Sequence, residues 1–199
     1  MSKRTVYLVL VRHTQTDHNA EHRYSGARED VPLNETGLEQ ARGLANTLGL
    51  LRLSFEPVWC SDLIRTQQVG RIIAGLVDRR LVLDPRLREV DIGQMGGLIK
   101  NEALARFPEP HFRTSSSDFD FTSIGGESRT QVVARLQACF DQILETYGAP
   151  DDENAVFVIV ISHGTALRIM LEELGINPPV LHEQGGFQTI CYSKEVDND

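Results

Sequence analysis

The stretch VYLVLVRHTQTDHN, residues 6–19, places an arginine and a histidine directly after a run of apolar residues. Val6–Val11 is rich in valine and leucine, which is typical of a strand buried on both faces of a sheet. Arg12 and His13 would then follow the carboxyl end of that strand. Because ligands of open α/β sheets bind beyond these strand ends, the stretch predicts both a central strand and a binding site.

Similar apolar runs recur along the chain and alternate with helical patterns. Strands are predicted at Pro57–Cys60, Arg80–Leu83 and Ala155–Ile161, with an antiparallel edge strand at Phe187–Tyr192. Helices are predicted over Thr36–Leu48, Asp62–Val77, Lys100–Arg106, Ser128–Thr146 and Thr165–Leu174. This alternation predicts an α/β fold, a three-layer α/β/α sandwich around a mostly parallel sheet.

Capping residues mark several of the predicted helix ends. Thr36 and Glu39 form a Thr-x-x-Glu pattern that predicts a capping box. Ser61 or Asp62 is expected to cap the helix that follows it, and Gly175 is expected to end the helix before it.

Residues 1–199 are predicted to form a single domain with a cap insertion at about 108–127. Within it, Pro108–Gly126 is rich in Ser, Asp, Phe and Pro and has no helical or strand period. Its three phenylalanines could line a substrate cavity, but we expect them to anchor the insertion to the core: Phe112, Phe119 and Phe121.

The composition excludes several classes of protein. The formal net charge of the 199 residues is −8, which disfavours nucleic-acid binding. No run approaches the about 20 apolar residues that span a bilayer, so no membrane partner is expected. The three cysteines are far apart and odd in number, which predicts reduced thiols and a cytoplasmic location. The oligomeric state stays open, a homodimer included.

Polar residues follow the other predicted strands as well. If the sheet is as predicted, two histidines, two arginines and a glutamate meet at its edge: Arg12, His13, Arg65, Glu89 and His163. Each has a simpler explanation alone, since a histidine at a strand end is usually solvated and Glu89 could pair with Arg86 or Arg88. Their coincidence at one edge favours a site.

Five segments carry a resemblance to a known family. They are Arg12-His13-x-x-Thr16, Ser61-Asp62-Leu63-x-Arg65-Thr66, Leu87-x-Glu89-x-x-x-Gly93, Gly126-Glu127-Ser128 and Ser162-His163-Gly164. In this order, between about residues 6 and 165, the chain resembles the histidine phosphatase superfamily, also called phosphoglycerate-mutase-like.

The resemblance implies a role for each of the five clustered residues. His13 would be the nucleophile that forms a phosphohistidine, and Arg12 and Arg65 would hold the phosphate oxygens. His163 would be a further donor and should be protonated in that role. Glu89 would protonate the leaving group and then activate water. The resemblance implies no metal and no cofactor.

Further phosphate contacts follow from the same resemblance. They would come from Asn19, Ser25, Gly26 and the backbone N–H of Gly164. Asp17 or Asp62 could compete with Glu89 for the acid role, but the family's motif favours Glu89.

Thr14 departs from the usual motif, which has glycine after the histidine. Glycine adopts backbone conformations that a β-branched residue resists. Either φ is negative here or Thr14 is strained. Its hydroxyl could bond phosphate or a neighbouring loop.

The predicted function is a phosphomonoesterase that hydrolyses a small phosphorylated metabolite. The alternative is a 2,3-bisphosphoglycerate-dependent phosphoglycerate mutase, which needs more basic groups around its substrate. Arg113 is the only Lys or Arg in the cap, which weakens that alternative, although Lys100 with Arg23 or Arg28 could supply charge. A catalytically silent phosphoryl-binding module is less favoured, since such a module need not keep all five residues.

A metal-dependent hydrolase is also less favoured. His13, His18 and His22 are close in sequence and, with Asp17, could imitate a metal cluster. No HExxH or comparable signature is present, however, and the substrate itself is not predicted.

Overall fold

A computed structural model describes residues 2–150, 155–176 and 183–196. Within them, the strands are β1 (Ser2–Arg12), β2 (Val58–Cys60), β3 (Leu81–Leu83), β4 (Ala149–Pro150), β5 (Phe157–Ser162) and β6 (Phe187–Val196). The helices are α1 (Asp17–Ala20), α2 (Glu35–Leu50), α3 (Ile64–Leu76), α4 (Lys100–Arg106), α5 (Arg129–Tyr147) and α6 (Gly164–Glu173).

The strands form one mixed sheet in which the parallel pairs lie at the centre. The order is β3-β2-β5-β1-β4, and β6 also pairs with β1. β1, β5, β2 and β3 are parallel to their neighbours in this order, whereas β6 runs antiparallel to β1 along its length. The predicted antiparallel strand is thereby confirmed. The two-residue strand β4 was not predicted, and it also pairs antiparallel with β1.

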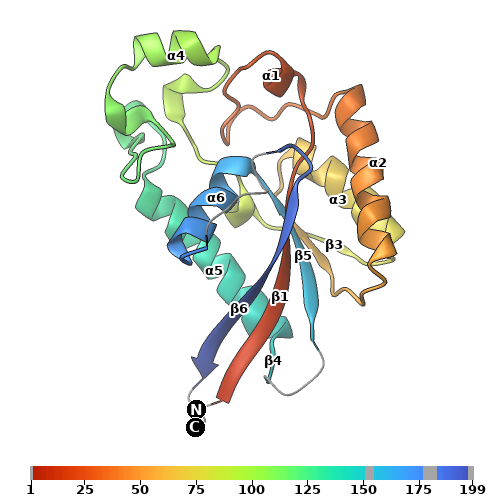
Figure 1. Cartoon of the computed structure of the whole chain (residues 1–199). Helices are drawn as coiled ribbons and strands as arrows, with labels where there is room; N and C mark the ends of the chain where they lie inside the picture. The colour runs from red at the N-terminus through yellow and green to blue at the C-terminus, as the bar shows by residue number, and fades with distance from the viewer. Residues whose placement is uncertain (1, 151–154, 177–182, 197–199) are drawn as a thin grey trace.

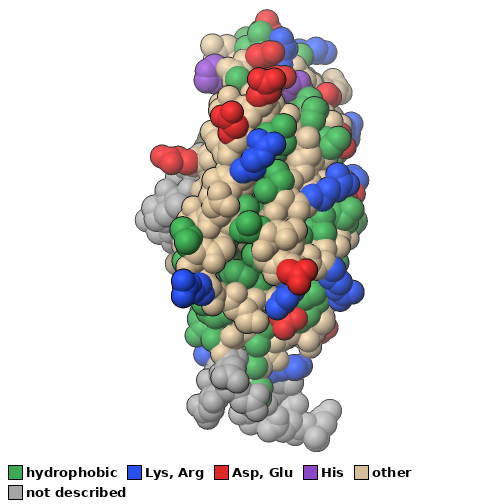
Figure 2. All heavy atoms as spheres, turned by 90° about the vertical axis from the view of Figure 1, so that its right-hand side faces the viewer, with side chains coloured by type: hydrophobic (Ala, Val, Ile, Leu, Met, Phe, Trp, Pro, Cys, Tyr) green, Lys and Arg blue, Asp and Glu red, His purple; other side chains and the backbone are tan. Residues whose placement is uncertain are grey.

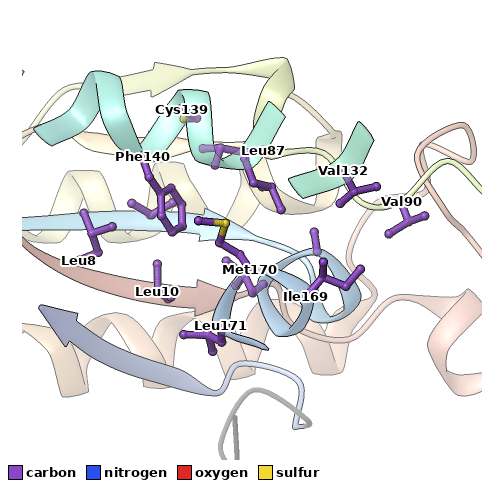
Figure 3. Packing of buried hydrophobic residues seen from close by; sticks show 14 of the residues in the cluster. Leu8, Leu10, Leu87, Val90, Val132, Cys139, Phe140, Ile169, Met170 and Leu171 are labelled. Atoms are coloured by element: carbon purple, nitrogen blue, oxygen red, sulfur yellow. The ribbon is translucent and has the colours of Figure 1, made fainter. Parts of the chain in front are cut away.

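Alternate residues of β1 point into two hydrophobic layers. Leu8 and Leu10 are fully buried in a cluster with side chains of α5 and α6, and Figure 3 shows them beside Phe140 and Met170. Val9 and its second neighbour Val11 belong to a cluster with α2 and α3 on the other face. The helix pairs lie on opposite sides of the sheet in Figure 1, which confirms the three-layer α/β/α fold.

The start of α2 differs from the predicted capping box. The helix begins at Glu35, and the side chain of Asn34 accepts a hydrogen bond from the Gly37 N–H at 2.9 Å. Thr36 therefore lies inside the helix and cannot cap it. Asn34 has the short polar side chain that an N-cap needs, two residues before the position that the Thr-x-x-Glu pattern suggested.

The start of α3 is also capped differently from the prediction. The helix begins at Ile64, whose N–H donates to the Asp30 carboxylate at 2.6 Å. Asp30 is distant in sequence, so no local pattern could reveal this cap. Ser61 and Asp62 lie before the helix and make other contacts. By contrast, Gly175 follows α6 with φ +70°, as predicted for a glycine that ends a helix.

The segment 108–127, predicted to be a cap insertion, is fixed to the core by its aromatic side chains. Phe112, Phe119 and Phe121 are buried in the hydrophobic cluster that includes α5 and α6. The anchoring prediction is confirmed. The Arg113 guanidinium donates to the carbonyls of Phe107 and nearby residues of the same segment, so it holds the insertion together.

The outer face on the α2 side is mixed in character. Figure 2 shows hydrophobic side chains there among basic and acidic ones. The exposed hydrophobic residues include Leu50 and Leu51 at the end of α2 and Leu76 at the end of α3. No helix in the described part of the chain is long and apolar enough to cross a membrane.

Thr14 connects the segment after β1 to the first turn of α2. Its backbone does not have a positive φ, and its buried hydroxyl donates to the Gly37 carbonyl at 2.7 Å. Thr14 is therefore not strained, and the suggested phosphate contact through its hydroxyl is wrong. At Gly37 a β-carbon would lie 2.0 Å from the Gln15 carbonyl oxygen, so only glycine allows this close approach.

Two glycines of α2 give a matched test of that contact. We expect Gly37→Ala to lower the free energy of unfolding by about 1–3 kcal/mol, because the added methyl overlaps the backbone of Gln15. Gly43 has open space around its β-position, so Gly43→Ala should raise stability by about 0.5–1 kcal/mol through helix propensity. Urea denaturation of both variants measures the difference. Equal stability of the two variants would contradict the close packing.

Candidate active site

The register of the parallel pair β1 and β5 brings two histidines together. Arg12 and Ser162 are partners at the ends of these strands, and the His13 N–H donates to the Ser162 carbonyl at 3.1 Å. His163 directly follows β5, and the centroid of its ring lies 5.1 Å from that of the His13 ring. The rings are inclined by 65°, an edge-on arrangement.

The tautomer of His13 follows from its hydrogen bond. Its Nδ1 lies 2.7 Å from the Thr14 carbonyl oxygen, which can only accept. Nδ1 therefore carries the proton in the neutral ring, and Nε2 carries the lone pair. Burial and the charge of Arg65 lower the pKa of His13 well below its usual value, with a smaller effect of Arg12 in the same direction. His13 is thus a neutral imidazole at pH 7.

His163 lies behind His13 and is fully buried. Its Nε2 is 2.9 Å from the Ser61 hydroxyl, and its Nδ1 has no hydrogen-bond partner among the described residues. Burial and Arg65 lower the pKa of His163 well below its usual value. A cation at this position would be desolvated beside a guanidinium, and the protonated His163 that the resemblance implies for the phosphate complex stays a prediction.

Arg65 lies in the first turn of α3, and backbone carbonyls of a distant loop hold its guanidinium. Its Nη1 donates to the Glu29 carbonyl at 2.9 Å and its Nη2 to the Gly26 carbonyl at 2.8 Å. The side chain is 1% exposed, and burial lowers its pKa to about 10. The negative charges of Glu89 and Asp30 raise this pKa, but their effect is smaller than that of burial. A guanidinium so desolvated favours a bound anion.

Arg12 lies against the start of α6. A β-carbon on Gly164 would stand 2.8 Å from the Arg12 Cζ, so glycine makes room for the guanidinium. Burial lowers the pKa of Arg12, and the nearby Glu89 carboxylate opposes this effect. Gly164 thus shapes the site by its missing side chain. The donor role predicted for its N–H stays a prediction.

Glu89 is oriented by backbone N–H groups. Its Oε1 accepts from Val90 at 3.0 Å and from Ala166 at 2.9 Å, and its Oε2 accepts from Thr165 at 3.2 Å. Pairing with the neighbouring arginines, the simpler explanation, is not found. Arg86 pairs with Asp84, and Arg88 pairs with Asp62.

Most of the predicted site residues line one cavity of about 240 Å³. Those lining it are Arg12, His13, Asn19, Ser25, Gly26, Arg65 and Glu89. His163 and Gly164 are not among the lining residues and support the site from behind. The cavity also contains residues that the motifs did not single out: Tyr24, Val90, Ile92, Thr114 and Thr165. Thr165 directly follows the last of the five segments, Ser162-His163-Gly164, and could have been inferred, whereas Thr114 lies between the segments and had no signal.

The two polar residues of the first loop also have local structural roles. The Asn19 carboxamide oxygen accepts from the Thr16 N–H at 3.1 Å, and this bond closes the capping box of α1. The Ser25 hydroxyl lies 3.2 Å from Nδ1 of His18. Both side chains are therefore held at the cavity wall by neighbours in sequence.

The competing acids lie elsewhere. Asp17 accepts from the Asn34 side chain at 3.2 Å, and Asp62 pairs with Arg88 at 2.6 Å. Neither carboxylate lines the cavity. Across the described ranges of the chain, no three His, Cys, Asp or Glu side chains gather as a metal site would require.

Two further cations lie at the cavity. Arg23 and Lys100 both line it, as the alternative mutase function would need. Arg23 pairs with Glu21 at 2.6 Å, and the Lys100 ammonium lies 5.8 Å from the centre of the Tyr24 ring. Arg28, the other candidate cation, pairs with Asp91 and does not line the cavity.

The fold and the paired histidines at the carboxyl edge of a parallel sheet define an α/β protein of the phosphoglycerate-mutase-like class. The profile of the histidine phosphatase superfamily (branch 1) matches residues 8–194, and the chain belongs to this family. It is 30% identical to a 2,3-bisphosphoglycerate-dependent phosphoglycerate mutase of Azorhizobium caulinodans, over 95% of this chain and 97% of that protein.

Solved structures that resemble the chain include phosphatases. A structure named mycobacterial hydrolase 1 has a TM-score of 0.78 and 26% identity, covering 94% of this chain and 92% of the other. A mycobacterial glucosyl-3-phosphoglycerate phosphatase in complex with VO3 has a TM-score of 0.73 and 26% identity, covering 86% and 81%. The relatives thus include both mutases and phosphatases.

The buried histidines should make stability depend on pH. An unfolded histidine binds a proton below about pH 6.5, whereas folded His13 and His163 do not, because their pKa values are lowered. Stability is therefore full above pH 6.5 and falls below it, by up to about 1.4 kcal/mol per pH unit for each histidine. Urea denaturation between pH 5 and 8 measures this slope.

Variants separate the buried histidines from the others. His163→Asn should reduce the slope below pH 6.5 by up to about 1.4 kcal/mol per pH unit. The control His22→Asn replaces an exposed histidine with φ 54°, a conformation that asparagine tolerates, and should leave the slope unchanged. An unaltered slope in His163→Asn would show that His163 titrates alike in both states.

Proposed function

We propose that the protein is a metal-independent phosphomonoesterase that acts on a small phosphorylated metabolite through a phosphohistidine on His13. One observation supports this proposal more strongly than the others do. The Thr14 carbonyl fixes His13 with its Nε2 lone pair available, at a cavity that the buried guanidinium of Arg65 and the half-buried one of Arg12 also line. A neutral nucleophile beside desolvated cations suits attack on a phosphate.

In the first half of the reaction, Nε2 of His13 attacks phosphorus and the bond to the leaving oxygen breaks. Glu89 gives its proton to that oxygen, so an alcohol departs and a carboxylate remains. Arg12 and Arg65 oppose the charge on the equatorial oxygens. His163 becomes protonated as the phosphate dianion binds, because the added negative charge offsets its burial.

In the second half, water replaces the alcohol. The Glu89 carboxylate takes a proton from the water while its oxygen attacks phosphorus, and the bond to Nε2 breaks. Phosphate leaves, His13 returns to its neutral form and Glu89 is again protonated. The cavity is lined by both His13 and Glu89, as this order of events requires.

A phosphoglycerate mutase is the second candidate. Lys100 and Arg23 at the cavity favour it, as do the names of curated relatives such as that of Azorhizobium caulinodans. A mutase has to retain a bisphosphorylated intermediate, which requires several cations beyond those that hold the transferred phosphate. Arg23 is already paired with Glu21, and Arg113 of the cap is bonded to backbone carbonyls. These contacts favour the phosphatase.

A direct comparison of the two activities tests the proposal. The protein is assayed on p-nitrophenyl phosphate and a panel of phosphorylated metabolites with EDTA present, and for interconversion of phosphoglycerates in parallel. We expect hydrolysis that EDTA does not reduce. No turnover of any monoester would favour a silent phosphoryl-binding module, loss with EDTA would favour a metal-dependent hydrolase, and faster interconversion than hydrolysis would favour the mutase.

Replacing the nucleophile should abolish the covalent intermediate. We expect His13→Ala to give no acid-labile phosphoenzyme with phosphorus-labelled substrate and to lower kcat by at least about 10³-fold, because the two-step path is lost. Rapid quenching and measurement of protein-bound label give the intermediate. The exposed variant His22→Asn is the control. Retained labelling in His13→Ala would place the phosphoryl group on another residue.

The acid role of Glu89 predicts a dependence on the leaving group. Glu89→Gln should lower kcat/KM for an alkyl phosphate by about 10²-fold or more, since an alkoxide needs a proton to depart. The loss for p-nitrophenyl phosphate should be much smaller, because nitrophenolate leaves without one. Steady-state kinetics with both esters measure the ratio. An equal loss for both would show that Glu89 only orients the substrate.

A further inference from the structure

The segment that carries Glu89 has no regular secondary structure of its own. Residues 88–92 lie between two short 3₁₀ turns, Pro85–Leu87 and Gly93–Met95. A loop without helix or sheet hydrogen bonds places a side chain less accurately than a regular element does. Proton transfer requires a fixed donor within hydrogen-bond reach. Other groups must therefore hold this segment in place.

Arg135 of α5 supplies much of that support. Its Nη1 donates to the carbonyls of Arg86 at 2.8 Å and Arg88 at 2.7 Å, and its Nη2 donates to the carbonyl of Glu89 itself at 3.0 Å. One guanidinium thus bonds three carbonyls within four residues of chain. The planar fork of arginine can do this, whereas a single ammonium cannot reproduce its geometry.

Glu127 orients that guanidinium and adds two bonds to the same segment. Its Oε1 accepts from Nε of Arg135 at 2.8 Å, and its Oε2 accepts from Nη2 at 3.0 Å. Its Oε2 also accepts from the Asp91 N–H at 2.9 Å, and its own N–H donates to the Asp91 carbonyl at 2.7 Å. Together Glu127 and Arg135 provide the hydrogen bonds that a neighbouring strand would otherwise supply.

Buried side chains fix the same segment on α5. Leu87 and Val90 flank Glu89 and belong to the hydrophobic cluster that contains Val132 and Phe140 of α5 (Figure 3). Arg135 holds the backbone of this segment, and the side chains of Leu87 and Val90 are buried. The Glu89 carboxylate then reaches the N–H groups at the start of α6. The position of the carboxylate thus depends on contacts on both sides of its backbone.

We propose that Arg135, oriented by Glu127, is a positioning residue that holds Glu89 where it transfers its proton. This inference rests on the proposed function, because it acts through the acid role of Glu89. Neither Arg135 nor Glu127 lines the cavity that contains His13. Their loss should therefore spare the nucleophile and the arginines that bind phosphate, and impair proton transfer in both halves of the reaction.

Arg135→Lys tests the proposal with a charge-preserving change. We expect kcat/KM for an alkyl phosphate to fall by about tenfold to a hundredfold, the scale of a misplaced catalytic group. The value for p-nitrophenyl phosphate should change by less than about threefold, since its leaving group needs little acid. With p-nitrophenyl phosphate the labelled phosphoenzyme should accumulate above the wild-type level, because water activation also slows.

Arg129→Lys is the matched control on the same helix. Arg129 pairs with Glu172 and Glu173 and is exposed to nearly the same extent as Arg135, with side chains 19% and 17% exposed. It should leave both kcat/KM values and the phosphoenzyme level unchanged. Glu127→Gln keeps the size of the side chain and should reproduce the selective loss expected for Arg135→Lys. It replaces Arg135→Lys as the test if Arg135→Lys does not fold.

Wild type and Glu89→Gln are measured beside these variants to separate the two proposals. If wild type does not turn over, the proposed function fails. If Glu89→Gln loses both esters equally, the acid role of Glu89 fails, and the positioning role of Arg135 fails with it. If Glu89→Gln is selective but Arg135→Lys and Glu127→Gln are unaffected, or lose both esters equally, the positioning role is overturned and the acid role of Glu89 stands.

Discussion

The hydrogen bond from the His13 N–H to the Ser162 carbonyl continues the parallel pairing of β1 and β5 one residue beyond the strands. This register decides which side chains meet at the sheet edge. A shift of one residue would turn His13 to the opposite face and separate it from His163, since strand side chains alternate between faces. The two buried layers on either side of β1 make such a shift costly, because every core residue of the strand would move with it.

Much of the fold followed from sequence because its signals are local. The apolar runs and helical periods located β1, β5, α4 and α5 to within a few residues, and the motifs identified seven residues that line the cavity. The errors lie where contacts are distant in sequence. Asp30 caps α3 across more than thirty residues, and the Thr14 hydroxyl bonds Gly37, so neither partner could be read from a local pattern.

The lowered pKa of His163 could not be predicted from the sequence, for a related reason. A residue type indicates which atoms can donate, but its charge depends on burial and on the groups around it. His163 is fully buried near Arg65 and His13, and these surroundings exist only after the chain has folded. The supports of Glu89 were equally hidden. Arg135 is one arginine among many in the sequence, and only the fold brings its guanidinium to the three backbone carbonyls at and just before Glu89.

The charge of a bound phosphate connects the neutral histidines to the proposed reaction. Both histidines are neutral beside the guanidiniums of Arg12 and Arg65. A phosphate dianion would bring two negative charges to this group, and protonation of His163 would offset part of them. Since buried net charge is expensive, binding of phosphate should draw a proton into the site. The lowered pKa of His163 and its protonation in the proposed phosphate complex are then two consequences of the same electrostatic constraint.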